Sequence, residues 1–234
     1  MASSNEKTFG SKLANAETLA THLTGFTAYA PVRPEESVVN YKLLITNIKT
    51  NNTLVASTQT TYSQATDKRE KLFAKNTDSM IKTLTLIGGQ IRSKFGKTSK
   101  EAEYIASLIT KIRGESLKKK KKDDEGEFVS QSERSYGSQT QTFTDIIATL
   151  TTYGADYAPA NVKIKLPALN AQLTALTTAN ANVTTAYSAY KPAKDNRKVQ
   201  YADLKDRSNR IKDSVKSQYT TASTEYKLIK GLSI

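Results

Sequence analysis

The chain has 234 residues, which is enough for one large domain or two of ordinary size. It carries 35 Lys and Arg against 22 Asp and Glu, a formal net charge of +13, with no Cys and one His. This composition excludes a disulfide scaffold, a zinc ribbon, a haem or iron–sulfur site and a cysteine nucleophile.

The first twelve residues can be compared with the pattern of a secretory signal. Residues 1–12 have no apolar core behind a basic start, so we expect no cleaved secretory signal. No stretch approaches the roughly 18 consecutive apolar residues of a membrane-spanning helix. The sequence therefore predicts a cytoplasmic protein, although export without a cleaved leader would leave the same pattern.

The first predicted helix covers residues 9–26. Its apolar positions recur every three or four residues, as on one face of a helix. The Ala30-Pro31 pair then discourages further helix, because proline restricts the residue before it. The face consists of Phe9, Leu13, Ala16, Ala20, Leu23 and Phe26.

Residues 38–62 form the clearest pattern, a heptad seam typical of coiled coils. Its positions alternate in steps of three and four and contain one Asn. An Asn at such a position costs stability but fixes register and partner number, so Asn52 is predicted to set the register. The alternative is an Asn that faces water at the helix edge. The seam consists of Val38, Tyr41, Ile45, Ile48, Asn52, Val55, Gln59 and Tyr62.

Two further helices are predicted before residue 115. The first places Met80, Leu84, Ile87, Ile91 and Phe95 on one face, and the second begins at a capping-box spacing, Thr98 to Glu101. Gly96-Lys97-Thr98 resembles a phosphate-binding loop, but the glycine required five residues earlier is Ile91. Gly96 is instead predicted to end a helix.

Residues 116–134 are predicted to form a linker between two parts of the chain. They include five consecutive lysines, Lys118–Lys122, followed by Asp123, Asp124 and Glu125. A block of like charges followed by acids is typical of a solvated linker, and it could also serve as a basic contact strip.

The second half of the chain repeats the first. At a shift of 128 positions, residues 38–74 align with residues 166–202 without a gap, and nine of the 37 pairs are identical. Later segments align at a shift of 124. The sequence thus predicts two copies of one unit, 8–115 and 135–232, with convergent amphipathic patterning as the alternative. The second seam consists of Leu166, Leu169, Leu173, Leu176, Asn180, Val183, Tyr187 and Tyr190.

Asn180 has the same predicted register-setting role as Asn52. Pro192 stands where the first copy has Gln64, and we expect it to kink the helix or to start a new one. Strand signals are weak. The predicted fold is all-α: an internally duplicated up-and-down helical bundle, with three long helices plus one short helix in each repeat.

Basic residues concentrate in the third region of each copy. Residues 67–113 hold eleven Lys and Arg against five acids, and residues 191–216 hold nine against four. Such regions could bind phosphate backbones without reading sequence, contact a membrane or an acidic protein, or simply keep a helix face soluble. The candidate polyanion-binding residues are Lys94, Lys97, Lys100, Lys194, Arg197, Lys198, Arg207, Arg210, Lys212 and Lys216.

The sequence shows no group of residues typical of a catalytic, cofactor-binding or metal-binding site. His22 stands alone, and no Glu-x-x-His pair or calcium-loop spacing is present. The sequence therefore predicts a non-enzymatic structural or scaffolding protein without a cofactor, which binds another protein or copies of itself. The alternative is a non-specific nucleic-acid binder that uses the basic regions.

Overall fold

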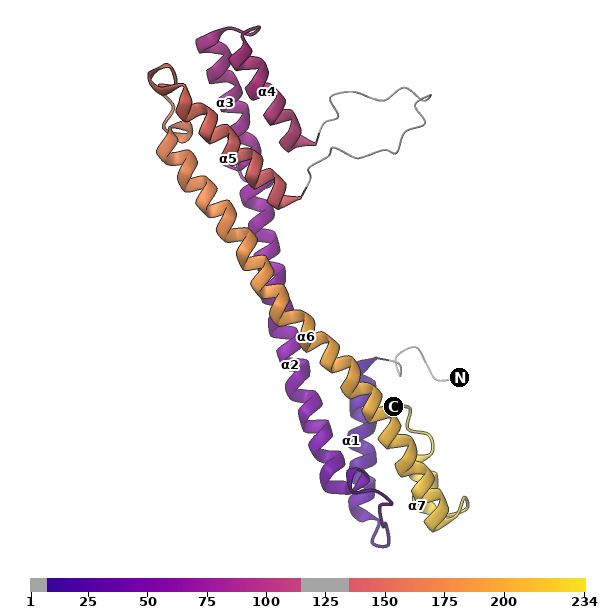
Figure 1. Ribbon diagram of the computed structural model, residues 1–234. Helices are drawn as coiled ribbons and strands as arrows, with labels where there is room; N and C mark the ends of the chain where they lie inside the picture. Colours follow the sequence, from indigo (N-terminus) through magenta and orange to yellow (C-terminus); the bar gives the residue numbers. More distant parts are fainter. Residues whose placement is uncertain (1–7, 115–134) are drawn as a thin grey trace, which may run out of the picture. The chain divides into compact units, whose positions relative to one another are not determined.

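The computed structural model describes residues 8–114 and 135–234, and every regular element in this part of the chain is helical (Figure 1). The predicted all-α class is therefore confirmed. The predicted linker, with its run Lys118–Lys122, lies outside the described residues. The α-helices are α1 (Phe9–Gly25), α2 (Val38–Glu70), α3 (Met80–Phe95), α4 (Lys100–Arg113), α5 (Tyr136–Thr152), α6 (Leu166–Tyr219) and α7 (Thr224–Ile229).

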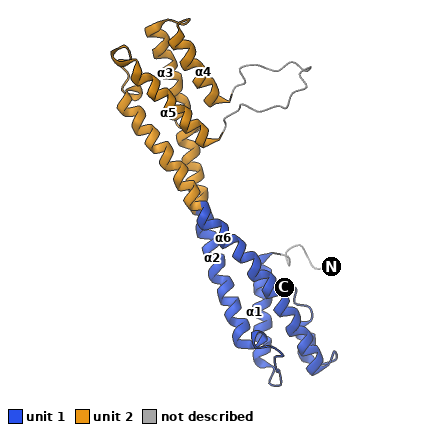
Figure 2. Cartoon of the chain, viewed as in Figure 1, with its two compact units in different colours: residues 1–60, 187–234 blue, residues 61–186 orange. Residues whose placement is uncertain are grey.

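The helices form two compact units, each built from both halves of the sequence (Figure 2). Unit 1 combines residues 1–60 with residues 187–234, and unit 2 comprises residues 61–186. The long helices α2 and α6 each contribute one part to each unit. Neither unit therefore coincides with one of the repeats predicted from the sequence.

Unit 1 has its own apolar core, formed by α1, the first part of α2, the second part of α6 and α7. In its centre the Tyr41 hydroxyl group lies 2.6 Å from the Ser208 hydroxyl group, and both residues are buried. This bond satisfies two polar groups that would otherwise be costly to bury. The core includes Ala16, Leu19, Leu23, Ile45, Ile48, Leu204, Ile211, Val215 and Ile229.

Unit 2 has a separate core, and α4 is part of it. The helix α4 contacts both α3 and α5 and buries Ile105, Ile109 and Ile112 against them. These residues recur at helical spacing, so they form one apolar face. The other core residues include Phe73, Met80, Leu84, Ile87, Ile91, Phe143, Ile146, Ile147, Leu150, Leu169 and Leu176.

No new helix starts at Pro192, because α6 continues through this residue for 54 residues in all. The second copy therefore has one helix where two were predicted. In the first copy α2 ends at Glu70, a π-helical turn covers Lys71–Lys75, and α3 begins at Met80. The first copy has four residues more at this point. The wider turn and the following break take up this extra length.

The heptad seam also needs correction near its end. Gln59 and Tyr187 are exposed, and Ala186 is buried in place of Tyr187. A straight helix has 3.6 residues per turn, so a strict 3.5-residue pattern drifts away from the buried face over several turns. The end of α3 and the start of α4 lie close to their predicted positions. Gly96 ends α3 with a φ of 95°, and Ser99 caps α4, one residue after the predicted Thr98.

Two buried tyrosines, Tyr41 and Tyr157, and the half-buried Tyr29 should titrate at unusually high pH. Burial, together with the Glu36 carboxylate, raises the pKa of Tyr29 to about 12, and burial alone raises the pKa of Tyr157 to about 12. Burial also raises the pKa of Tyr41 well above its ordinary value. Their hydroxyl groups donate to the carbonyl oxygens of Glu36 (from Tyr29) and Ile164 (from Tyr157).

The raised pKa values predict a loss of stability in alkali. Between pH 10 and about 12 the folded protein keeps these hydroxyl protons, whereas the unfolded chain releases them. The stabilisation that these tyrosines contribute is therefore fully present below pH 10 and is lost as the pH rises towards 12. Ultraviolet absorbance should show most tyrosines ionising first and this group later, as the melting temperature drops. Ionisation of all twelve tyrosines in one step near pH 10, with the fold intact, would contradict this prediction.

Candidate functional site

The second part of α6 carries a stripe of lysines. Their positions fall within a sector of about 60° when each residue turns the helix by about 100°. From the first to the last the stripe is about 37 Å long, at about 1.5 Å per residue. We call it the lysine stripe; it consists of Lys191, Lys194, Lys198, Lys205, Lys212 and Lys216.

The same helix keeps its acidic residues on another side. Asp195, Asp206 and Asp213 lie about 40–60° around the helix from the nearest edge of the stripe, and Asp203 lies about 120° from it. The buried side of the helix, with Leu204 and Ile211, flanks the stripe opposite these acids. The lysine stripe therefore forms a strip of positive charge between the core and the acidic face.

The lysines of the stripe differ in their contacts. Lys191 pairs with Asp195 at 2.5 Å, and the Lys194 ammonium lies 5.8 Å from the centre of the Tyr190 ring. Lys212 is half-buried, donates to the carbonyl oxygen of Leu232, and has its pKa lowered by burial. The remaining members are exposed: Lys198, Lys205 and Lys216.

The three predicted arginines of this region lie outside the stripe and make contacts within unit 1. The Arg197 guanidinium lies 4.8 Å from the centre of the Phe9 ring. Arg207 pairs at 2.8 Å with Asp203, four residues before it on α6. Arg210 also has an acid, Asp206, four residues before it, but it contacts Glu36 at 3.0 Å.

The Glu36 carboxylate is the most buried charged group in these contacts. The residue is 2% exposed, whereas the Arg210 side chain is 45% exposed. A buried carboxylate is stable only when a cation or hydrogen bonds compensate its lost hydration. Arg210 supplies this compensation, which gives it a structural task that its sequence position did not reveal.

The predicted basic residues of the first copy belong to unit 2. Lys94 pairs with Asp156 at 3.1 Å, and both side chains are largely exposed. Lys97 and Lys100 are exposed at the turn between α3 and α4. Exposed pairs of this kind contribute little stability. Unit 2 does not bring these lysines into a stripe like that of unit 1.

The two seam asparagines each bond to a neighbouring segment of their own unit. Asn52 donates to the Tyr201 hydroxyl oxygen at 2.9 Å. Asn180 donates to the Thr140 hydroxyl oxygen at 3.1 Å and more weakly to the Tyr136 carbonyl oxygen at 3.4 Å. A shift of one helix turn would break either bond, which is consistent with the predicted register-setting role.

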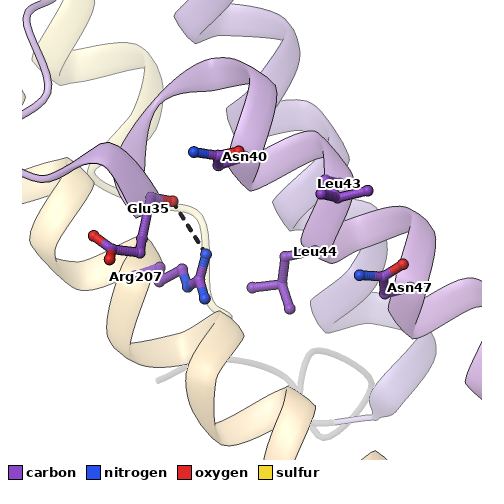
Figure 3. A pocket seen from close by; sticks show the side chains of 6 residues that line it. All are labelled: Glu35, Asn40, Leu43, Leu44, Asn47 and Arg207. Carbon is purple, nitrogen blue, oxygen red and sulfur yellow. Dashed lines mark hydrogen bonds between the residues drawn. The ribbon is translucent and has the colours of Figure 1, made fainter.

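Unit 1 also has a shallow hollow beside α2, of about 170 Å³ (Figure 3). Across it the Arg207 guanidinium donates to the Glu35 carbonyl oxygen at 3.2 Å. Side chains of Leu43 and Leu44 give it an apolar wall. The sequence patterns did not predict this hollow. The signal for it was Leu43, an apolar residue outside the heptad seam. Its other lining residues are Asn40 and Asn47.

Apolar residues continue along the outer side of α2. Val39 is 76% exposed, Leu43 56% and Leu54 49%. Together with Asn47 and Thr50 they recur in steps of four, four, three and four, so they share one face of the helix. We call this the outer α2 face.

Among the described residues, no cluster of three or more His, Cys, Asp or Glu could hold a metal ion. Within the same ranges, none of the helices combines the length and apolar character needed to cross a bilayer. Comparison with known protein families, with curated proteins and with solved structures finds no significant similarity to this chain.

Proposed function

We propose that the chain is internally duplicated and that its copies exchange halves, so that each compact unit takes pieces from both. Matching contacts at shifts of 127 or 128 positions support this proposal. The Phe9 and Tyr201 rings lie 4.5 Å apart in unit 1, and the Tyr136 and Phe73 rings lie 4.8 Å apart in unit 2. A guanidinium covers the first ring of each pair: Arg197 over Phe9, and Arg69 over Tyr136.

A second set of contacts supports the same proposal. Phe26 packs against Tyr219 at 5.8 Å, and Tyr153 packs against Phe95 at 5.2 Å. In each unit the polar seam position is an Asn whose amide nitrogen donates to a nearby helix. Similar amphipathic patterning accounts for buried apolar faces, but it does not account for matching arginines and asparagines.

We further propose that the protein is a non-catalytic scaffold that associates with copies of itself or with another protein through helix faces. The outer α2 face carries this proposal, because it keeps three large apolar side chains in water on one side of one helix. Apolar surface gathered in this way, bordered by polar residues, is typical of protein–protein interfaces. Val39, Leu43 and Leu54 are its expected contacts.

Sedimentation over a wide range of protein concentration tests self-association. The wild-type protein should sediment faster as the concentration rises, and Leu43→Glu with Leu54→Glu should abolish this change, because each glutamate would have to be buried in the interface. Leu86→Glu with Val162→Glu, two exposed apolar positions of unit 2, is the matched control. A wild-type protein that remains monomeric throughout would contradict self-association.

The lysine stripe favours a second candidate function, non-specific binding of a polyanion such as nucleic acid. A labelled DNA duplex of about 30 base pairs should then bind at low salt and lose affinity steeply at physiological salt. Lys194→Glu, Lys198→Glu and Lys205→Glu together should abolish binding and leave the helical circular dichroism unchanged. Binding that persists in this triple variant would show that the stripe is not the site.

A further inference from the structure

In unit 1, the helices α2 and α6 lie side by side and run in opposite directions (Figure 2). Near one end of this pair the Tyr41 hydroxyl group bonds to Ser208. Further along α2 the Asn51 amide donates to the Ala193 carbonyl oxygen at 3.2 Å. Val199 stands between these two contacts on α6 and is 66% exposed. It therefore lies level with the middle of the outer α2 face.

Val199 projects to the same side of this helix pair as the outer α2 face does. At about 100° per residue, Leu43 and Leu54 lie about 60–80° around α2 from Asn51, which faces α6. Val199 lies about 80° around α6 from Arg207, which reaches towards α2. Both rotations lead away from the core. We call this shared surface, the outer α2 face together with Val199, the α2–α6 face.

The part of this face that α2 contributes is uncharged. Between positions 38 and 60 the charged residues of the helix are Lys42 and Lys49, and both bond to side chains of α1. The hydroxyl groups of Thr46 and Thr50 donate to carbonyl oxygens of their own helix, four residues back. Burying these threonines against another molecule therefore leaves no hydroxyl donor without an acceptor.

The face contains both a hollow and a side chain of the size to fill it. The shallow hollow beside Leu43 has a volume of about 170 Å³ (Figure 3). Cavities of about 150 Å³ hold a benzene molecule, so a leucine side chain fits here. Leu54 projects from the same face about 16 Å further along α2. A second copy turned end for end would place its Leu54 in this hollow, and its own hollow would receive Leu54 of the first copy.

The same rotation matches the rest of the face. Its axis would cross α2 midway between Leu43 and Leu54, at the level of Val199, so that the two Val199 side chains meet. On the side of α6 away from α2, Asp206 lies seven residues after Val199 and Lys191 lies eight before it. The rotation brings Asp206 of each copy to the level of Lys191 of the other, which places opposite charges together. Two further acids near the axis are paired within their own copy: Asp195 and Asp203.

We propose that two copies of the chain form a dimer through the α2–α6 face, with their α2 helices antiparallel and Leu54 of each in the hollow of the other. This inference rests on the proposed self-association and specifies its geometry. Two adjacent helices, each about 10 Å wide, present about 600 Å² over the roughly 30 Å from residue 39 to residue 58. The two copies together would bury about 1,200 Å², the lower end of the range for specific, stable interfaces.

Cross-linking of single-cysteine variants tests this arrangement, because the chain itself has no Cys. The full-length protein is treated with a short bismaleimide, which joins two thiols. Val199→Cys should form a covalent dimer about tenfold or more faster than Val39→Cys, because thiols held close together react at a high effective concentration. Val39 is the matched control: it is 76% exposed on the same face, but its two copies would stand about 28 Å apart in the dimer.

A mixture of two variants tests the fit of Leu54 into the hollow. Leu43→Cys and Leu54→Cys proteins, mixed, should cross-link faster than either protein alone, because residue 43 of one copy lies opposite residue 54 of the other. Circular dichroism should show every variant folded, since all four substituted positions are exposed.

Sedimentation of the same samples separates this inference from the proposed self-association. Copies that associate while Val199→Cys and Val39→Cys cross-link at equal rates would overturn the antiparallel arrangement and leave self-association standing. A protein that remains monomeric, with equally slow cross-linking of both variants, would overturn both, and the face would then belong to a partner of another kind.

Discussion

Replacing Phe143 by Ala should unfold unit 2 and leave the core of unit 1 intact. Phe143 lies on α5 and is fully buried in the core of unit 2. Removing a buried phenyl group costs about 3–5 kcal/mol, through lost burial and the cavity that remains. This is a large part of the roughly 5–15 kcal/mol that stabilises an ordinary domain.

Amide hydrogen exchange measures this effect helix by helix. In Phe143→Ala, α3, α4 and α5 should lose protection, whereas α1 should keep it, because α1 packs only in the core of unit 1. The matched variant Leu19→Ala, which opens the core of unit 1, should reverse the pattern. Equal loss of protection in all helices of both variants would mean that the two cores unfold as one.

Replacing Arg210 by Met should destabilise unit 1 by about 2–3 kcal/mol, because it leaves the buried Glu36 carboxylate without its cation. The loss should be smaller than for a fully buried pair, since Arg210 is itself 45% exposed. Unit 2 suggests the compensating change, because Ile164 stands at the position that matches Glu36 and is also buried.

The double variant with Glu36→Ile and Arg210→Met should therefore recover most of the lost stability. Both partners are then apolar, and no buried charge remains to be compensated. Urea unfolding of the wild type, both single variants and the double variant gives the coupling free energy between the two positions. A double variant that loses as much as the two single losses combined would show that the pair is not coupled.

The helices themselves could be predicted from the sequence, because helix formation depends on local patterns. The spacing of apolar residues located α1 and α3, and Gly96 marked the end of α3. The continuity of α6 through Pro192 could not be predicted. The local cost of a proline in a helix is about 3 kcal/mol, and packing along the rest of a long helix can outweigh it.

The pairing of helices could not be predicted, because a seam shows which face is buried and not which helix covers it. Arg210 shows the same limit for the site. Helical spacing favours a bond to Asp206, four residues before it, whereas its partner, Glu36, is 174 positions away. The lysine stripe, in contrast, follows from sequence and helix geometry alone once α6 is known to be continuous.

Nuclear Overhauser effects between aromatic rings test most directly whether each unit takes its pieces from both repeats. Selectively labelled protein should show contacts between Phe9 and Tyr201 and between Phe73 and Tyr136, whose ring centres lie 4.5 and 4.8 Å apart. If each repeat folded by itself, Phe9 would instead contact Phe73, and Tyr136 would contact Tyr201. That second pattern would contradict the exchanged arrangement.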